Sequence, residues 1–232
     1  MNLNAMPKTL ALIPDGNRRW SMRHKLSVLN GYNIGVRKFI EFAEWCMSYG
    51  IDSITVWAFS SDNFSRPKRE IDALFSIYKR AAHDKKLIAR LHRNRTRVQI
   101  IGDKEMLPRD LRNALQKLEA ETSKHKDRVL NLLIGYGGRE DILHAAKKAA
   151  ETFIESGVNI ESAFEKSLLS YGVPNLDLII RTSGERRLSG FMPWQSNYSE
   201  LYFSKKLWPD FTRADLRCAL ADYSKRQRRF GK

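Results

Sequence analysis

The sequence predicts an α/β fold, a single domain over residues 1–232 with a central, mostly parallel six-stranded sheet surrounded by helices. Short apolar runs alternate with longer segments of helical periodicity, and this alternation is typical of β-α units and a parallel sheet. Most of the short runs are continuously apolar, as in a sheet that is buried on both faces. No repeat, low-complexity segment or Pro/Gly-rich linker divides the 232 residues.

Six of the apolar runs are candidate strands, the last one shorter, and they cover residues 10–13, 53–58, 98–101, 129–134, 176–180 and 201–203. Segments with helical periodicity cover residues 36–47, 70–91, 107–124 and 141–154. The apolar stripe of the segment 70–91 shifts near its end, which predicts a bend or a change of packing partner. Thr212, with Asp215 three residues later, forms the pattern of a capping box that opens a last helix.

The chain is strongly basic. It has 41 Lys and Arg residues against 26 Asp and Glu residues, which gives a formal net charge of +15. Such a surface favours polyanionic partners: nucleic acid, an anionic membrane or phosphorylated substrates. Many of the lysines also fit the simpler interpretation that they lie on solvated helix faces.

Composition also indicates where the protein acts. The hydrophobic content of 42% and charged content of 29% are those of an ordinary globular protein. No stretch approaches the roughly 18 apolar residues of a membrane-spanning helix, and residues 1–8 lack the pattern of a signal peptide. Cys46 and Cys218 lie far apart in predicted helices, and we interpret both as reduced packing residues. These features predict a cytoplasmic protein.

The segment after the first candidate strand has features of a phosphate site. Ligands of parallel α/β sheets bind beyond the carboxyl ends of the strands, and here the sequence reads PDGNRRW. Gly16 permits close approach of the backbone to a ligand, near a helix start whose amides can hold an anion. Arg18 and Arg19 would clamp a phosphate, and Asp15 is a hard ligand for Mg²⁺ against a diphosphate. An Asp-Gly turn with a solvated basic pair is the alternative.

Two further loops carry arginines in the same structural position. The second strand is followed by FSSDNFSRP, in which Asn63 and Arg66 can reach a ligand, although a capped helix entrance explains the same residues. The fifth strand is followed by RTSGERRLS. There Arg181, Arg187 and Ser189 form a set that suits a diphosphate, with a solvated loop as the alternative.

Glu200 begins the last strand, and a second carboxylate near Asp15 would complete a metal site.

Other classes of site find little support. The sequence contains neither the phosphate loop of nucleoside triphosphatases nor the glycine fingerprint of dinucleotide-binding folds. The five histidines show no zinc-ligand spacing, and no Cys or Ser occupies a nucleophile elbow.

Taken together, these motifs resemble the cis-prenyltransferase family, of which undecaprenyl diphosphate synthase is the familiar member. The resemblance covers nearly the whole chain in the family's order and spacing, and it includes the closing arginine-x-glycine signature in RRFG. The motifs that carry it are DGNRRW, AFSSDNFSRP, IGD, YGGR, IRTSGERRLS and YSELYF.

The resemblance implies a parallel sheet ringed by helices, a hydrophobic tunnel for the growing chain, and a homodimer. It implies a Mg²⁺-dependent enzyme that condenses isopentenyl diphosphate with an allylic prenyl diphosphate, releases diphosphate and creates a Z double bond. The product would be a polyprenyl or short-chain prenyl diphosphate. The basic surface would suit the anionic substrates, and peripheral contact with a membrane in which long products partition.

The resemblance also implies roles for individual residues. Asp15 would hold Mg²⁺ against the allylic diphosphate with support from Glu200, and Asn63 and Trp20 would lie near the reacting carbons. Arg181, Arg187 and Ser189 would hold isopentenyl diphosphate, and Gly231 would reach the partner subunit's site. The implied substrate-binding residues are Gly16, Asn17, Arg18, Arg19, Ser60, Phe64, Arg66, Arg181, Arg187, Ser189 and Gly231.

The chain departs from the family pattern near the allylic site. Val28 and Tyr32 stand where the family usually has an arginine and a histidine that help to bind the allylic diphosphate. Pro14 replaces the usual methionine before the first motif, and Leu133 and Ile134 are bulkier than the small residues common there. Some members of the family join prenyl units irregularly, so irregular coupling is an alternative activity for this chain.

Two other classes of function remain as alternatives. Non-catalytic partner subunits occur in the family, but they typically lose the metal aspartate and the strand-end arginines, which persist here as Asp15, Arg181 and Arg187. A nucleic-acid-binding protein is indicated by charge alone, and no recognised nucleic-acid module occurs in the sequence.

Overall fold

Six parallel strands form the centre of the computed structural model, which describes residues 6–226. Every paired strand in this part of the chain runs parallel to its neighbour, in the order β3-β4-β2-β1-β5-β6. The predicted sheet is therefore confirmed, with strand ends that differ by up to two residues from those predicted. The strands are β1 (Thr9–Ile13), β2 (Ser53–Ser60), β3 (Thr96–Ile101), β4 (Arg128–Tyr136), β5 (Leu178–Arg181) and β6 (Glu200–Phe203).

Eight α-helices and three short 3₁₀ helices occur in the described residues. Two α-helices, α1 and α7, are short and were not predicted as elements, because neither is long enough to show an apolar period. The α-helices are α1 (Asn17–Arg23), α2 (Val28–Ser48), α3 (Lys68–Ala82), α4 (Lys85–Arg93), α5 (Arg109–Thr122), α6 (Gly138–Ser156), α7 (Ile160–Ser167) and α8 (Arg213–Tyr223). The 3₁₀ helices are η2 (Ser61–Ser65), η3 (Lys104–Met106) and η4 (Trp208–Asp210).

Capping side chains set three of the helix boundaries. The Ser27 hydroxyl accepts a hydrogen bond from the Asn30 amide, so α2 begins well before the predicted residue 36. The predicted helix 70–91 is two helices, because the Asp84 side chain accepts from two amides and starts α4. The break lies just before the point where the apolar stripe shifts. The predicted capping box of Thr212 and Asp215 opens α8.

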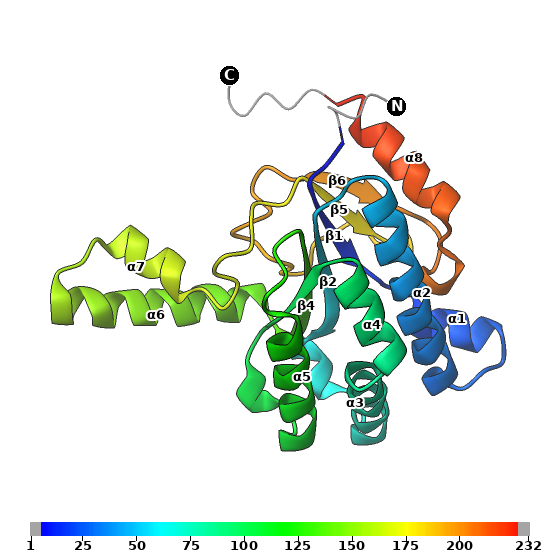
Figure 1. Cartoon of the computed structure of the whole chain (residues 1–232), viewed down its shortest axis with the longest axis horizontal. Helices are drawn as coiled ribbons and strands as arrows, with labels where there is room; N and C mark the ends of the chain where they lie inside the picture. Colours follow the sequence, from blue (N-terminus) through cyan, green and yellow to red (C-terminus); the bar gives the residue numbers. More distant parts are fainter. Residues whose placement is uncertain (1–5, 227–232) are drawn as a thin grey trace.

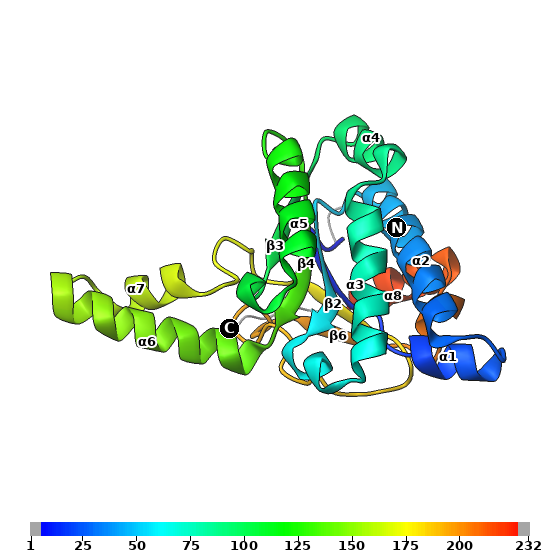
Figure 2. The same cartoon turned by 90° about the horizontal axis from the view of Figure 1, so that it is seen from below.

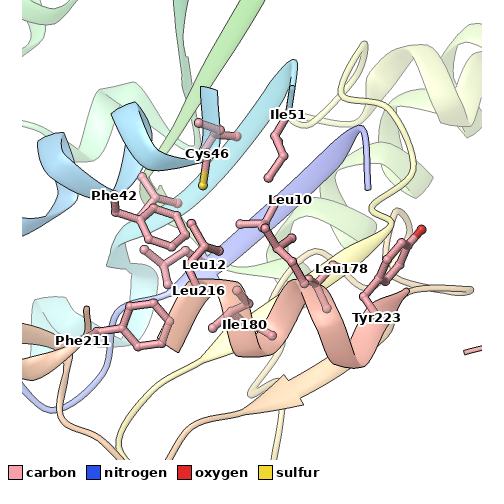
Figure 3. Close-up of a cluster of buried hydrophobic side chains, with 14 of the residues drawn as sticks. Leu10, Leu12, Phe42, Cys46, Ile51, Leu178, Ile180, Phe211, Leu216 and Tyr223 are labelled. Atoms are coloured by element: carbon pink, nitrogen blue, oxygen red, sulfur yellow. The ribbon is translucent and has the colours of Figure 1, made fainter. Parts of the chain in front are cut away.

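One face of the sheet packs against helices. Side chains of β1 and β5 meet α2, η4 and α8 in a buried cluster that includes Leu10, Leu12, Phe42 and Ile180 (Figure 3). On the same face, β2, β3 and β4 pack against α3, α4 and α5. The large apolar side chains on these helices therefore anchor the site loops, which connect directly to the strands.

An irregular segment covers part of the opposite face. Ala11, Ile13 and Ile179 point from the sheet toward Phe191 and Met192 of the chain between β5 and β6. Phe191 and Met192 are fully buried. The loop that follows β5 is consequently held in place by its own apolar core, which gives the polar residues within it a fixed position.

Helices α6 and α7 lie side by side and project from the rest of the molecule as an arm (Figures 1 and 2). Several large apolar side chains on this arm are exposed, among them Leu143, Phe153 and Ile154, which is 82% exposed. An apolar surface of this kind is unusual for a face that meets only water.

No helix in the described part of the chain combines the length and apolarity needed to cross a bilayer. Both cysteines are free, as predicted. Cys46 is buried, and burial raises the pKa of its thiol. Cys218 is exposed on α8, so the prediction that it is a packing residue is wrong: it lies on the helix face opposite the buried Leu216 and Leu220.

Candidate active site

Loops from three neighbouring strands meet at the carboxyl end of β1, β5 and β2. A cavity of about 430 Å³ begins there, and seven of the predicted site residues line it. These residues are Asp15, Asn17, Ser60, Asn63, Arg66, Arg181 and Ser189. The side chains follow strands that are far apart in sequence, so the parallel sheet is what brings them together.

Arg181 is the most deeply buried cation of the site. It ends β5, and its side chain is only 7% exposed. One terminal nitrogen donates to the Arg187 carbonyl at 2.5 Å and to Ser189 Oγ at 3.0 Å, and the other donates to Asp15 Oδ2 at 3.1 Å. Its Nε is buried without a partner among the described residues. An unpaired charged donor is costly in a protein interior, and a nearby anionic ligand would offset part of that cost through the charge of the guanidinium.

Asp15 is held at the mouth of the cavity by its backbone as well as by its carboxylate. Its carbonyl accepts a hydrogen bond from Thr182 Oγ1 at 2.7 Å. The carboxylate is paired with Arg181 at 3.1 Å and Arg19 at 3.6 Å, and about a third of the side chain is exposed. The neighbouring Gly16 has φ +107°, and a Cβ there would lie 2.8 Å from Leu207 Cδ2. A side chain at this position would be strained at this φ and would crowd Leu207.

Arg19 and Arg187 form the outer part of the site. Arg19 Nη2 donates to Ser183 Oγ at 2.6 Å, and its other terminal nitrogen lies 3.4 Å from Glu185. The opposite carboxylate oxygen of Glu185 accepts from Arg187 at 2.6 Å. Glu185 therefore links the loop after β1 to the loop after β5. It also partly neutralises the charges of Arg19 and Arg187, both of which are predicted to bind diphosphate.

The loop after β2 is built by its own polar side chains. Asn63 Oδ1 accepts from the Ser60 amide at 3.2 Å, and Ser60 caps η2 in return. The strand is irregular at Phe59, which turns its end toward the cavity. Phe64 packs edge to face with Phe59, with ring centroids 4.9 Å apart. The structure therefore places Phe64 in the wall behind the site rather than in the lining.

A partly buried carboxylate that was not predicted from the sequence lies beside this loop. Glu70, on α3, accepts from Tyr32 Oη at 2.6 Å and pairs with Arg66 Nη1 at 3.3 Å. Arg66 also donates to Tyr32 Oη at 2.8 Å, and Arg18 Nε lies 3.9 Å from Glu70. Burial and the hydrogen bond to Glu70 raise the pKa of Tyr32. The sequence signal for this pair was the spacing of Arg66 and Glu70, because opposite charges four residues apart at a helix start can form an ion pair.

Trp20 is not brought to the cavity, contrary to the prediction. Its indole N–H donates to Asp210 at 2.6 Å, and its ring stacks on His24. The inner side of α1 is occupied by Asn17 and Ser21, which pack closely on glycines of α2. Trp20 therefore faces η4 instead of the place where a substrate would react.

Glu200 is also distant from Asp15 within one chain, and the expectation that the two lie close together is wrong. Glu200 begins β6 opposite Leu178, which is itself opposite Leu10 of β1. Asp15 lies beyond the other end of β1, so the separation along the strands is roughly 10 Å or more, in addition to two strand spacings. Glu200 pairs instead with Arg226 at 2.5 Å. The predicted Gly231 lies outside the described residues.

The donor set nevertheless fits Mg²⁺ bound through substrate. Mg²⁺ commonly binds through one or two carboxylates, with substrate phosphates and water completing six positions. Asp15 supplies one exposed carboxylate beside two arginines. Among the described residues, no cluster of three or more potential protein ligands surrounds it. A metal at this position would therefore depend on phosphate oxygens for most of its ligands.

From this polar end, the cavity extends along the helical face of the sheet. Apolar side chains of α2, α3, β2 and β4 line its middle, including Phe39, Leu74, Val56 and Leu132. Its other end is lined by residues at the beginning of β3 and β4 and at the ends of α2 and α4: Glu44, Met47, Arg90, Asn94, Thr96 and Arg128. The cavity thus has a charged end, an apolar middle and a second polar end. A tunnel for a growing chain remains a prediction.

The chain matches a protein family and several known proteins. Residues 13–231 match the prenyltransferase family model described as undecaprenyl diphosphate synthase. The chain is 41% identical to an isoprenyl transferase of Thermus thermophilus over 98% of this chain and 89% of the relative. It is 38% identical to a tritrans,polycis-undecaprenyl-diphosphate synthase (geranylgeranyl-diphosphate specific) of Pyrococcus horikoshii, over 98% of this chain and 88% of the relative.

Two solved structures share the fold. Lavandulyl diphosphate synthase from Lavandula x intermedia, in complex with dimethylallyl diphosphate, superimposes with a TM-score of 0.92 at 35% identity. That match covers 99% of this chain and 100% of the other. A probable undecaprenyl diphosphate synthase from Campylobacter jejuni superimposes with a TM-score of 0.79 at 31% identity, covering 97% and 99% of the two chains.

Proposed function

Because the chain belongs to the undecaprenyl diphosphate synthase family of prenyltransferases, we propose that it condenses isopentenyl diphosphate with an allylic prenyl diphosphate and forms a Z-configured prenyl diphosphate. The reaction is Mg²⁺-dependent and takes place in the cytoplasm. The single observation that carries the proposal is the buried Arg181, which ends β5 beside Asp15 and has a charged donor that lacks a partner among the described residues.

The two diphosphates bind on either side of Asp15 in this proposal. Arg181, Arg187 and Ser189 hold isopentenyl diphosphate, because they lie within hydrogen-bond reach of one another in the loop after β5. The allylic diphosphate binds the loop after β1, from Gly16 to Arg19, with Arg66 on the opposite wall. Two charge-assisted sites side by side would bring the reacting carbons together and lower the entropic barrier to coupling.

Charge stabilisation is the main contribution of the protein to bond cleavage. The allylic carbon–oxygen bond breaks, and negative charge develops on the departing diphosphate, where fixed arginines stabilise it. Mg²⁺, held by Asp15 and diphosphate oxygens, would supply further positive charge to the leaving group. The apolar cavity wall, including Val36 and Phe39, excludes water from the cationic allyl fragment and contacts the prenyl tail.

A second candidate activity is irregular coupling of prenyl units. The observation that favours it is the Tyr32–Glu70–Arg66 network, which replaces a family histidine by a tyrosine bonded to a carboxylate. Glu70 holds part of the charge of Arg66 that would otherwise meet a diphosphate. The chain also superimposes well on lavandulyl diphosphate synthase in complex with dimethylallyl diphosphate. A shifted allylic diphosphate would present a different carbon to its partner.

Assembly as a homodimer is also part of the proposal. The arm of α6 and α7 exposes Leu143, Phe153 and Ile154, and burial of such a surface is a common reason for association. Light scattering would give the mass of the assembly. A monomer at micromolar concentration would contradict this part of the proposal without affecting the chemistry.

Product analysis separates the regular from the irregular activity. The purified chain is incubated with labelled isopentenyl diphosphate and a panel of allylic diphosphates, with Mg²⁺ and with EDTA. Elongated, Z-configured products that require both substrates support regular condensation. Products formed from allylic diphosphates alone indicate irregular coupling. Incorporation that is the same with EDTA contradicts the metal requirement.

A further inference from the structure

We propose that the edge of the molecule where the strands begin is a docking surface for an anionic lipid bilayer, and that the far end of the cavity opens on it. The inference rests on the proposed function, since it assigns the prenyl product a route into the membrane. It concerns a different part of the molecule from the diphosphate site, at the opposite end of the sheet.

The order of strands and helices places two basic segments at this edge of the sheet. Residues 84–95 contain α4 and lead into β3, and residues 123–128 connect α5 to β4. In a parallel sheet, both connections lie where the strands begin. Figure 2 shows α4 at the opposite end of α3 from α1, which carries the diphosphate motif. We call the cations of these segments the basic rim: Lys85, Lys86, Arg90, Arg93, Arg95, Lys124, Lys126 and Arg128.

Most of the charge of the basic rim is not neutralised. Asp84 and Asp127 are the acidic residues of these two segments; Asp84 caps α4 and Asp127 pairs with Arg95 at 2.6 Å. Arg90 pairs with Glu44 of α2 at 3.3 Å. The remaining exposed cations, which form no ion pair with another described residue, are Lys85, Lys86, Arg93, Lys124 and Lys126.

The far end of the cavity lies inside this rim and is lined by partly exposed side chains. Arg90, Asn94 and Arg128 line its far end together with Glu44, and the Arg90 and Glu44 side chains are 48% and 44% exposed. The inner side of α4 contributes Leu87 and Leu91 to the same cavity. A hydrocarbon chain that extends along the apolar middle of the cavity would therefore emerge between cations, beneath a short amphipathic helix.

These features match a bilayer better than a nucleic acid. The negative surface of a membrane attracts clustered Lys and Arg side chains, and the apolar cavity opening among them offers a path for a prenyl chain into the acyl region. Nucleic-acid surfaces for single strands add exposed aromatic side chains on which bases stack. The two segments of the basic rim contain no Phe, Trp or Tyr residue.

The test measures binding to vesicles with matched triple variants. The Lys86→Gln, Lys124→Gln, Lys126→Gln variant removes three exposed cations of the rim. The Lys147→Gln, Lys148→Gln, Lys166→Gln variant removes the same charge from the arm. Partitioning onto vesicles of phosphatidylcholine and phosphatidylglycerol in equal amounts is measured at physiological salt. Removal of the three rim lysines should weaken binding to the vesicles about 100-fold, since each cation contributes about five-fold. The arm variant should bind the vesicles at least ten times better than the rim variant.

A local probe places the contact. In a Cys218→Ser background, a polarity-sensitive fluorophore on Arg93→Cys should shift to the blue when the same vesicles are added, whereas a fluorophore on Lys166→Cys should not. Equal loss of binding in the two triple variants, or a shift at the arm instead of the rim, overturns the proposal. Binding to duplex DNA that exceeds binding to the vesicles also overturns it and identifies a nucleic-acid partner.

Prenyl transfer measured without vesicles keeps the two proposals apart. The rim variant should turn over short substrates at the wild-type rate, because none of its changes touches the diphosphate site. If the wild-type chain binds anionic vesicles through the rim but transfers no prenyl group, the proposed function fails and the docking surface stands. If transfer is normal and rim-dependent binding is absent, the docking surface is contradicted alone.

Discussion

At the scale of single residues, the character of the site depends on how its cations are paired. Arg181 is buried and contacts Asp15, Ser189 and the Arg187 carbonyl. Arg187, by contrast, is 62% exposed and pairs with Glu185. Arg181 is therefore fixed within the protein's framework, whereas Arg187 is an exposed side chain on the surface. Substitutions of these two residues should therefore have different consequences.

Alanine at either position should weaken isopentenyl diphosphate binding. Each lost charge-assisted bond costs roughly 1.5–3 kcal/mol, or about 10- to 150-fold in affinity. Arg181→Ala should also lower the free energy of unfolding, because Asp15 loses its buried partner, while Arg187→Ala should leave stability within about 0.5 kcal/mol. Substrate titrations check the affinities, and denaturant unfolding checks the stabilities. An unchanged KM for isopentenyl diphosphate, with weaker allylic binding, would reverse the assignment of the two sites.

Asp15 carries the second prediction at this scale. Asp15→Ala should abolish turnover while the fold stays intact, because the variant loses the carboxylate proposed to hold Mg²⁺. Asp15→Asn serves as the control, since it keeps the shape and a carbonyl oxygen. Circular dichroism and turnover at increasing Mg²⁺ are the measurements. Turnover near the wild-type rate at saturating Mg²⁺ contradicts the metal role.

Val28 and Tyr32 carry the third prediction. The change Val28→Arg with Tyr32→His adds a cation and removes the hydroxyl that bridges Glu70 and Arg66. Allylic diphosphate affinity should rise at least several-fold and products should become regular, because one charge-assisted contact of roughly 1.5–3 kcal/mol is restored. Val28→Met with Tyr32→Phe is the matched control without new polar groups. If affinity and product pattern equal those of the parent, the two departures are neutral.

At the scale of elements, strands and long helices could be predicted from their apolar patterns, whereas helix caps and the faces of short helices could not. The strands were predicted within two residues because they are buried, apolar and bounded by polar loops. The helix break at Asp84 was visible as a shift of the apolar stripe, but the cap that causes it needed the structure. The direction of Trp20 on α1 was hidden from sequence, since a seven-residue helix has too little periodicity to show which face is buried.

The junction of α4 with the α5–β4 connection carries a pH prediction. His92 Nδ1 and His125 Nε2 are 2.8 Å apart, so one ring donates to the other. Desolvation, followed by the charges of His92, Lys124 and Arg95, lowers the pKa of His125 below its usual 6.5. The unfolded chain therefore binds the proton more readily than the folded one, and this pair should contribute stability that is present above pH 6.5 and is lost as the pH falls below it.

Denaturant unfolding of His125→Asn across this pH range checks the sign. The variant should lose less stability than the wild type on acidification, while His83→Asn, at an exposed position, should behave as the wild type does. Parallel curves for the wild type and His125→Asn would show that the histidine pair does not couple stability to pH.

At the scale of the whole molecule, the sheet explains why most of the site was visible in the sequence. Asp15, Asn63 and Arg181 follow three strands that the fold places side by side, so a strand-by-strand search finds them. Glu200 was expected near Asp15, but a residue that begins a strand of a parallel sheet lies at the opposite end from the residues that follow the strands. Glu70 was missed because it lies inside a helix, where a carboxylate usually faces water.

The same architecture separates two charged regions by an apolar cavity. The residues proposed to bind diphosphate lie where the strands end, and the basic rim lies where they begin. The diphosphates of the substrates would therefore bind at one end of the sheet, and the hydrocarbon chain of the product would leave at the other.

Transfer of a labelled isopentenyl unit is the direct measure of prenyl transfer by this chain. The wild-type chain and Arg181→Ala are incubated with labelled isopentenyl diphosphate, an allylic diphosphate and Mg²⁺, and the chain length and double-bond geometry of the products are determined. We expect elongated Z products from the wild type, none with EDTA, and a strongly reduced yield from the variant. Absence of any labelled prenyl product across a full panel of allylic diphosphates, from a folded protein with Mg²⁺ present, would contradict it.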